Sequence, residues 1–170
     1  MILYRRGKIF VAAIIVGAII VFTAMYIGAN QQAAILEEDV GIDLKDVRFK
    51  SFDEENNIIV LEVTFEFSNN SDTVMTVGEV VYDLLADDNF VCKGGKSYRD
   101  IPLIGRPQIF AFGISGPVRT ECEVAKNSVS EDIWNAILNG NMGDYTWRTQ
   151  GRAEVETSIS VITKEFDLWI

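Results

Sequence analysis

The chain contains no histidine among its 170 residues. Histidine is the usual general base near neutral pH, the usual partner of Ser and Cys nucleophiles, and the commonest zinc or copper ligand. Its absence removes most hydrolase and metalloenzyme sites from consideration. No Walker A or GxGxxG string occurs either, and Gly113-Ile114-Ser115-Gly116 only half resembles a nucleophile elbow. We expect no catalytic residues, no cofactor and no metal.

Charge is absent between Lys8 and Glu37, and almost every residue from Ile9 to Ala29 is apolar. A helix rises about 1.5 Å per residue, so roughly 20 such residues cross a hydrocarbon layer of about 30 Å. The sequence therefore predicts a transmembrane helix over Ile9 to Ala29, with the lipid bilayer as its partner.

The charges that flank this segment predict its orientation. Basic residues precede it (Arg5, Arg6 and Lys8), whereas the first charges after it are acidic. The positive-inside rule then places the N-terminus in the cytoplasm and the rest of the chain outside. We expect four parts: a cytoplasmic N-terminus (1–8), a transmembrane helix (9–29), a stalk (30–43) and an extracytoplasmic domain (44–170).

Two other readings of the apolar segment stay open. A cleaved signal peptide has a shorter apolar stretch and an A-x-A-like site, for which Ile27-Gly28-Ala29 is a poor match. Arg6-Gly7 resembles a type IV prepilin processing site, although Lys8 would then open the mature chain and Ala12 would replace the usual acidic residue. Small residues spaced four apart, Ala13/Gly17 and Ala24/Gly28, are compatible with helix packing in a membrane.

Cysteine is scarce. Cys92 and Cys122 are 30 residues apart, which is neither a redox CxxC nor a metal-ligand spacing. Outside the cytoplasm disulfides persist, so a bridge between neighbouring strands is expected. The alternative is two buried thiols that act as small hydrophobic side chains.

Acidic residues dominate the external part. From residue 37 onward 12 basic residues stand against 25 acidic ones, a formal charge of −13. Such a field repels nucleic acid and anionic lipid headgroups and favours solubility. Nucleic acid is therefore excluded as a partner.

Period-2 alternation predicts β-structure in the domain. The clearest strand is Ile59–Phe67, where every second residue is apolar. Val80, Tyr82 and Leu84 share one face of a second strand, and Gly94-Gly95 is expected to end a hairpin. The other expected strands are Val47–Phe49, Val74–Leu85, Phe90–Cys92, Gln108–Ile114, Val118–Val124, Tyr145–Val155 and Ile159–Ile170.

One short helix interrupts the strands. Ser128 and Glu131 have the spacing of a capping box, an apolar stripe follows over residues 133–138, and Gly140 suits the left-handed position after a helix. We predict a mainly β fold: an antiparallel immunoglobulin/fibronectin-like β-sandwich with one helix. A single sheet covered by the helix is the alternative. The three tryptophans are expected in the core.

Two kinds of turn residue could bind a metal ion or carry a modification. The acidic turns at Asp53-Glu54-Glu55 and Asp87-Asp88-Asn89 lack the spaced ladder of a calcium loop, so we expect ordinary turns. Asn69-Asn70-Ser71 is an acceptor triplet in a predicted exposed turn, which makes Asn69 a possible glycosylation site.

Several short motifs follow one another in a recognisable order: Leu61–Asn69, Val80–Leu84, Phe90–Gly94, Ile101-Pro102, the short helix, Tyr145–Gly151 and Phe166–Leu168. Their order resembles the group-2 late embryogenesis abundant (LEA) family, also called the WHy (water stress and hypersensitive response) domain. The resemblance covers about Asp46 to the C-terminus. Asn70 departs from it, because the family usually has proline there.

The resemblance implies a fibronectin-like sandwich without enzymatic activity, acting in stress protection or in protein interactions at the cell envelope. We therefore expect a non-enzymatic, single-pass membrane protein with an extracytoplasmic domain. The alternative is a structural subunit, pilin-like or accessory to a larger membrane complex, with other membrane protein subunits as partners.

Overall fold

The computed structural model describes residues 2–158 and 160–170, and it begins with one long helix. α1 runs over Ile2–Asp39. Within it Val11–Ala29 has a mean hydropathy of 2.5, contains no buried residue, and is long and apolar enough to cross a membrane. The expected apolar helix is thus present.

The range expected as a stalk, residues 30–43, is helical to Asp39 and enters a strand at Val40. The reason lies in the sequence, because residues 30–39 contain no Gly or Pro and are rich in helix-forming Ala, Gln, Leu and Glu. The division into four parts stays a prediction.

The remaining described residues form one antiparallel sheet in the order β1-β2-β7-β4-β3-β8-β9, with β5 beside β3 and β6 beside β2. The strands are β1 (Val40–Asp53), β2 (Ile58–Asn69), β3 (Met75–Ala86), β4 (Asn89–Ser97), β5 (Gln108–Ile109), β6 (Gly113–Ile114), β7 (Val118–Ala125), β8 (Trp147–Glu156) and β9 (Val161–Trp169). The short helices are α2 (Glu131–Leu138), η1 (Leu103–Gly105), η2 (Lys126–Ser128) and η3 (Met142–Asp144).

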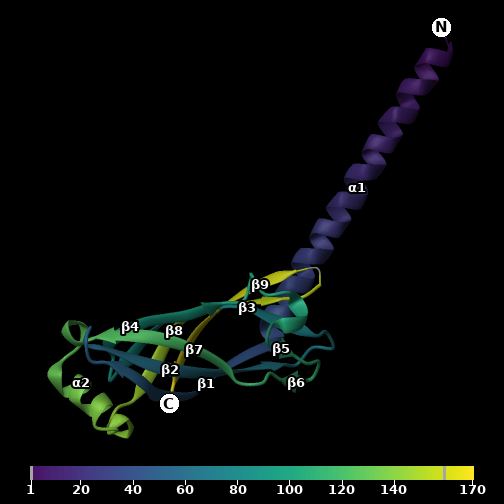
Figure 1. Ribbon diagram of the computed structural model, residues 1–170. Coiled ribbons are helices and arrows are strands. Elements are labelled where there is room, and N and C mark those ends of the chain that lie inside the picture. The colour runs from purple at the N-terminus through teal and green to yellow at the C-terminus, as the bar shows by residue number, and fades with distance from the viewer. Residues whose placement is uncertain (1, 159) are drawn as a thin grey trace.

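The sheet curls strongly on itself, with α1 leaving from one end and α2 lying at the other (Figure 1). The mainly β, antiparallel prediction is confirmed, but the two-sheet sandwich is not. β4 and β7 join the two halves of the sheet through only two residue pairs, Gly94↔Cys122 and Gly95↔Glu121. We call this short pairing the seam.

The concave side holds the core. The predicted inward set of β2 is confirmed, because Ile59, Leu61, Val63, Phe65 and Phe67 are all fully buried. On β3 the expected residues at positions 80, 82 and 84 are buried as well. The Phe65 ring lies 5.1 Å from the ring of Tyr82 and 5.5 Å from that of Phe166, centre to centre.

The glycines at positions 94 and 95 do not end a hairpin as predicted. Both lie inside β4, where Gly94 pairs with Tyr82 and Gly95 with Val81. A Cβ at Gly94 would collide with the Tyr82 ring, and one at Gly95 with the backbone of Val80. Glycine is therefore needed for close approach within the strand and not for a turn.

The helix α2 starts later than the proposed capping box. Ser130, not Ser128, caps it by accepting a hydrogen bond from the Ile133 amide, while the Ser128 hydroxyl donates to the Ala125 carbonyl. The short 3-10 helix η2 (Lys126–Ser128) lies just before this cap and includes Ser128. Gly140 is left-handed with φ +76°, as expected.

Two further predictions are wrong, one about exposure and one about a strand. Trp134 and Trp147 are buried, but Trp169 is 57% exposed and lies against the Arg148 guanidinium. The expected strand Gln108–Ile114 is instead two pieces, β5 and β6, separated by a turn.

The strand β1 forms one edge of the sheet and is twice interrupted. β-bulges fall between Leu44 and Asp46 and between Phe49 and Ser51, so that Lys45 and Lys50 are the extra residues. Lys45 Nζ lies 2.9 Å from a Glu66 carboxylate oxygen, and this hydrogen bond raises the pKa of the Lys45 ammonium.

Candidate functional site

The most distinctive surface of the described chain lies at the end of the sheet where α1 enters, which we call the proximal end (Figure 1). The first residues of β1, β3 and β9 and the last residues of β2 and β8 meet here, because antiparallel pairing brings these strand ends together. β5 and β6 extend the same end through their pairing with β3 and β2.

Large apolar side chains are exposed at this end, ranging from Ile101 at 37% to Ile104 at 90%. We call this set the apolar rim. It consists of Val74, Ile101, Leu103, Ile104, Phe110, Phe112, Ile114 and Val161. Phe110, Phe112 and Ile114 alternate along the strand expected over Gln108–Ile114, a pattern that indicates one face. Alternation alone does not reveal that these side chains are exposed to solvent.

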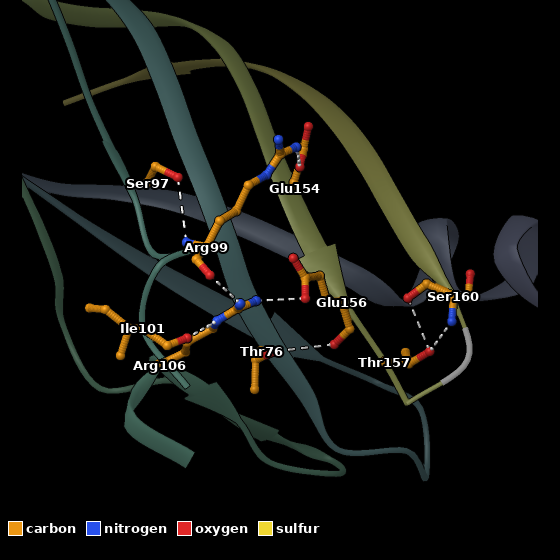
Figure 2. A network of polar contacts seen from close by, with 9 residues as sticks. All are labelled: Thr76, Ser97, Arg99, Ile101, Arg106, Glu154, Glu156, Thr157 and Ser160. Atoms are coloured by element: carbon orange, nitrogen blue, oxygen red, sulfur yellow. Dashed lines mark hydrogen bonds and ion pairs between the residues drawn. The ribbon is translucent and has the colours of Figure 1, made fainter. Parts of the chain in front are cut away.

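Arg106 fixes the first loop of the rim (Figure 2). Its guanidinium donates to a Glu156 carboxylate oxygen at 2.6 Å and to the carbonyls of Ile101 at 2.8 Å and Arg99 at 2.9 Å. The Arg106 side chain is only 10% exposed. The loop is thus tied to β8 from the inside, and its apolar tip, η1, projects outward.

A second ion pair supports the same loop. Arg99 contacts Glu154 on β8, and this hydrogen bond raises the pKa of the Arg99 guanidinium (Figure 2). Sequence reasoning missed both arginines. The available signal was composition: from Ile101 to Gly116 Arg106 is the only charged residue, in a chain that is 24% charged.

Asn69 fixes the second loop. Its side-chain amide donates to the carbonyls of Thr73 at 2.7 Å and Phe110 at 3.2 Å. Its side-chain oxygen accepts from the Ser71 amide at 2.9 Å and from the Ser71 hydroxyl at 2.8 Å. Asn69 therefore joins the end of β2 to the two turns that follow β2 and β5.

This placement differs from the exposed turn expected for the acceptor triplet. Asn69 is 1% exposed, and the nitrogen that would carry a glycan makes two hydrogen bonds. Turn-forming residues look exposed in a sequence, but an Asx side chain is often consumed by its own turn. Glycosylation of Asn69 stays a prediction of the triplet, and this geometry opposes it.

The structure brings the two cysteines together. Cys92 on β4 and Cys122 on β7 form a disulfide, with their Cα atoms 6.0 Å apart. The bond lies at the seam, because Cys122 is itself one of the two β7 residues that pair with β4. It therefore reinforces the place where the two halves of the sheet are joined by the fewest paired residues.

Tyr82 crosses the seam beside this disulfide. Its hydroxyl lies 2.8 Å from the Thr120 hydroxyl, which in turn donates to the Val63 carbonyl at 3.2 Å. Thr120 has one proton to give, so Tyr82 is the donor of the first bond. Burial raises the pKa of Tyr82 to about 12.

This shifted pKa predicts a loss of stability at alkaline pH. The unfolded chain ionises Tyr82 near pH 10 and the folded chain near pH 12, so the contribution is complete below pH 10 and disappears as pH rises toward 12. We expect the free energy of unfolding to fall by about 2–3 kcal/mol over this window. The Y82F variant should lack that part of the loss. Denaturant titrations of both chains at several pH values measure the difference, and parallel curves would contradict the assignment.

The acidic turns are engaged in local structure. An Asp53 carboxylate oxygen accepts from the Glu55 and Asn56 amides, and the Asn56 contacts lower the pKa of Asp53. Asp87 accepts from the Thr146 amide, and Asp88 pairs with Arg148. Among the described residues no group of three or more Cys, Asp or Glu could hold a metal ion.

The serine of the half-matching elbow is also engaged. Ser115 is 4% exposed, its hydroxyl donates to the Gly116 carbonyl at 2.7 Å, and it accepts from the Phe67 amide at 3.1 Å. It serves as a structural link between β2 and the loop after β6.

No family model and no curated protein matches this chain. Solved structures similar to it include a protein from Archaeoglobus fulgidus, with 11% identity, a TM-score of 0.46, and coverage of 75% of this chain and 94% of that one. A protein from Arabidopsis thaliana has 12% identity, a TM-score of 0.43, and coverage of 76% and 79%.

A third similar structure is that of a late embryogenesis abundant (LEA) protein solved in solution. It has 10% identity and a TM-score of 0.41, and the match covers 88% of this chain and 83% of that one. Structural neighbours of the chain thus include an LEA protein, as the resemblance in the sequence predicts.

Proposed function

We propose that this protein is a single-pass membrane protein whose LEA/WHy-like β domain lies outside the cytoplasm and acts without catalysis, by shielding the surface or binding proteins there. The observation that carries the proposal is the apolar helix over Val11–Ala29, which is not buried by the domain and belongs to the helix that leads directly into β1. An exposed apolar helix of this length needs a bilayer or a partner to cover it.

Two further features support the orientation, and a third supports the proposed role. Basic residues precede the helix and acidic ones follow it. The Cys92–Cys122 disulfide is a bond that persists in oxidising compartments. The strongly acidic domain resists self-association and stays hydrated at the surface. Stress protection or envelope protein interactions are the roles that this arrangement serves.

Alkaline extraction of membranes tests the anchor. The full chain should stay in the membrane pellet, and an impermeant reagent should label a C-terminal tag on intact cells. The matched control replaces Ile14 and Ile19 by lysine in the middle of the helix, where each charge costs about 2.5–3.5 kcal/mol. This variant should move to the soluble fraction. Extraction of the unaltered chain would contradict the proposal.

The alternative is a structural subunit. The intact mass of the purified chain separates the two readings, because prepilin processing would leave Lys8 as the first residue. A chain that starts at Met1 or Ile2 excludes processing. Migration in a mild-detergent native gel tests an accessory subunit, since a lone 19.0 kDa species contradicts it.

A further inference from the structure

The proximal end of the domain lies beside the part of α1 that follows the membrane-spanning segment. Ten residues separate Ala29 from Asp39, a rise of about 15 Å along the helix. The headgroup layer on each side of a bilayer is about 5–8 Å thick. A proximal end that reached back along α1 by several ångströms would therefore meet that layer.

The strand β9 does reach back along α1. Lys164 Nζ donates to the Glu37 carbonyl at 2.8 Å, so this part of β9 lies beside the last turns of the helix (Figure 1). Val161 precedes Lys164 by three residues, or up to about 10 Å along a strand. It is 59% exposed and belongs to the rim. The loop clamped by Arg106 is adjacent, because Glu156 ends the neighbouring strand β8.

The chemistry of the rim suits the boundary between headgroups and acyl chains. Its side chains are Phe, Leu, Ile and Val, and the one charge between Ile101 and Gly116 is the guanidinium of Arg106, paired inward with Glu156. No unpaired charge of that loop would have to leave water. Apolar and aromatic side chains of this kind insert shallowly at membrane interfaces.

The outward projection of the rim is built into the backbone. Phe112 has φ +50° and is 74% exposed. A left-handed conformation is uncommon for a bulky residue and persists only where its surroundings hold it. Here the Phe112 amide donates to the Ser71 carbonyl at 2.9 Å, within the turn that Asn69 organises.

The opposite end of the domain exposes fewer large apolar side chains than the rim. Its exposed apolar side chains are Phe90, Leu138, Trp169 and Ile170, and it lies away from α1. The acidic domain repels anionic headgroups, so an attraction of the rim to lipid would be apolar and not electrostatic.

We propose that the apolar rim rests in the headgroup region of the bilayer that α1 crosses, so that the domain lies against the membrane and does not stand off from it. The inference rests on the proposed anchor. It adds a second, shallow contact with lipid, made by the loops that Arg106 and Asn69 hold.

Quenching by brominated lipids tests this contact with the full chain in phosphatidylcholine vesicles. F112W places a reporter on the rim, and I104W is a second one should the first fail to fold. F90W makes the same change at the opposite end, and the emission of the unaltered chain is subtracted. We expect the added emission of F112W or I104W to fall roughly twofold, as for a shallowly inserted ring. The added emission of F90W should be unchanged.

The outcomes separate the two proposals. Alkaline extraction of the same vesicles reports on the anchor alone, and release of the chain would remove both proposals. A retained chain whose rim reporters are not quenched overturns the lipid contact only. A rim reporter that is shielded from water but unquenched, on a chain that migrates as an oligomer, means that a second copy covers the rim, which also overturns it. Unchanged quenching at high salt is expected, since no charge pair drives the contact.

Discussion

Replacing Cys92 and Cys122 together by alanine is expected to lower the free energy of unfolding by about 3–4 kcal/mol. The bridge closes a loop with a sequence separation of 30 residues, and the chain entropy lost by the unfolded state on closing such a loop gives this magnitude. A typical domain is stable by 5–15 kcal/mol, so the loss is a large share of the total.

The position of the disulfide sharpens this expectation. Only two residue pairs join β4 to β7, whereas β2 and β7 pair over eight residues. Without the bridge, the seam should open before the rest of the sheet unfolds. Hydrogen exchange should therefore accelerate most at the β4 and β7 amides near Gly94 and Cys122.

Chemical reduction provides the matched control. A reductant should lower the denaturation midpoint of the unaltered chain and leave that of the double alanine variant unchanged. Equal midpoints for the oxidised and reduced chains would mean that the seam holds without the bridge. A uniform rise in exchange across all strands would contradict the local opening.

Replacing Asn69 by alanine should also be costly, at about 2–4 kcal/mol. The substitution removes four hydrogen bonds at a side chain that is 1% exposed. It leaves the carbonyls of Thr73 and Phe110 and the amide of Ser71 without these partners, and buried polar groups without partners are the expensive case. Denaturant titration of the full chain in detergent measures the loss.

Asn70 offers the control at the next position. It is exposed, and only its backbone amide is bonded, to the Asp39 carbonyl. N70A should change the free energy of unfolding by less than about 0.5 kcal/mol. Similar losses for N69A and N70A would refute the organising role of Asn69. The same role predicts that in the F112W background N69A weakens bromolipid quenching, since the Phe110 to Gly113 turn loses its support.

Short-range sequence patterns predicted much of this fold, because alternation and turn residues determine the conformation of neighbouring residues. Alternation identified β2 and its buried set, and Gly140 was recognised from the left-handed conformation that follows a helix. The seam was not predictable, since one short pairing decides whether the halves form one sheet or two, and no local pattern encodes it. The glycines of β4 looked like a turn because the groups that require them lie on another strand: the Tyr82 ring at Gly94 and the Val80 backbone at Gly95.

The candidate site was harder to predict for a related reason. Asn69 and Arg106 act through backbone carbonyls of residues that are distant or unremarkable in sequence. Within the rim, Phe110, Phe112 and Ile114 read as buried strand because apolar residues usually face a core. These residues lie at the end of the sheet where α1 enters, which suggests a contact with the membrane. That placement follows from the sheet topology and from no local sequence pattern.

The two bulges of β1 have a consequence for crowding. Chains confined to a membrane meet one another in two dimensions with their domains aligned, which favours joining of sheet edges into aggregates. In β1 each extra residue is a lysine, and both lysines are already paired with carboxylates of the same sheet. A neighbouring chain would have to match two kinks and break two ion pairs to extend the sheet. The edge next to the anchor is thereby protected against polymerisation at high surface density.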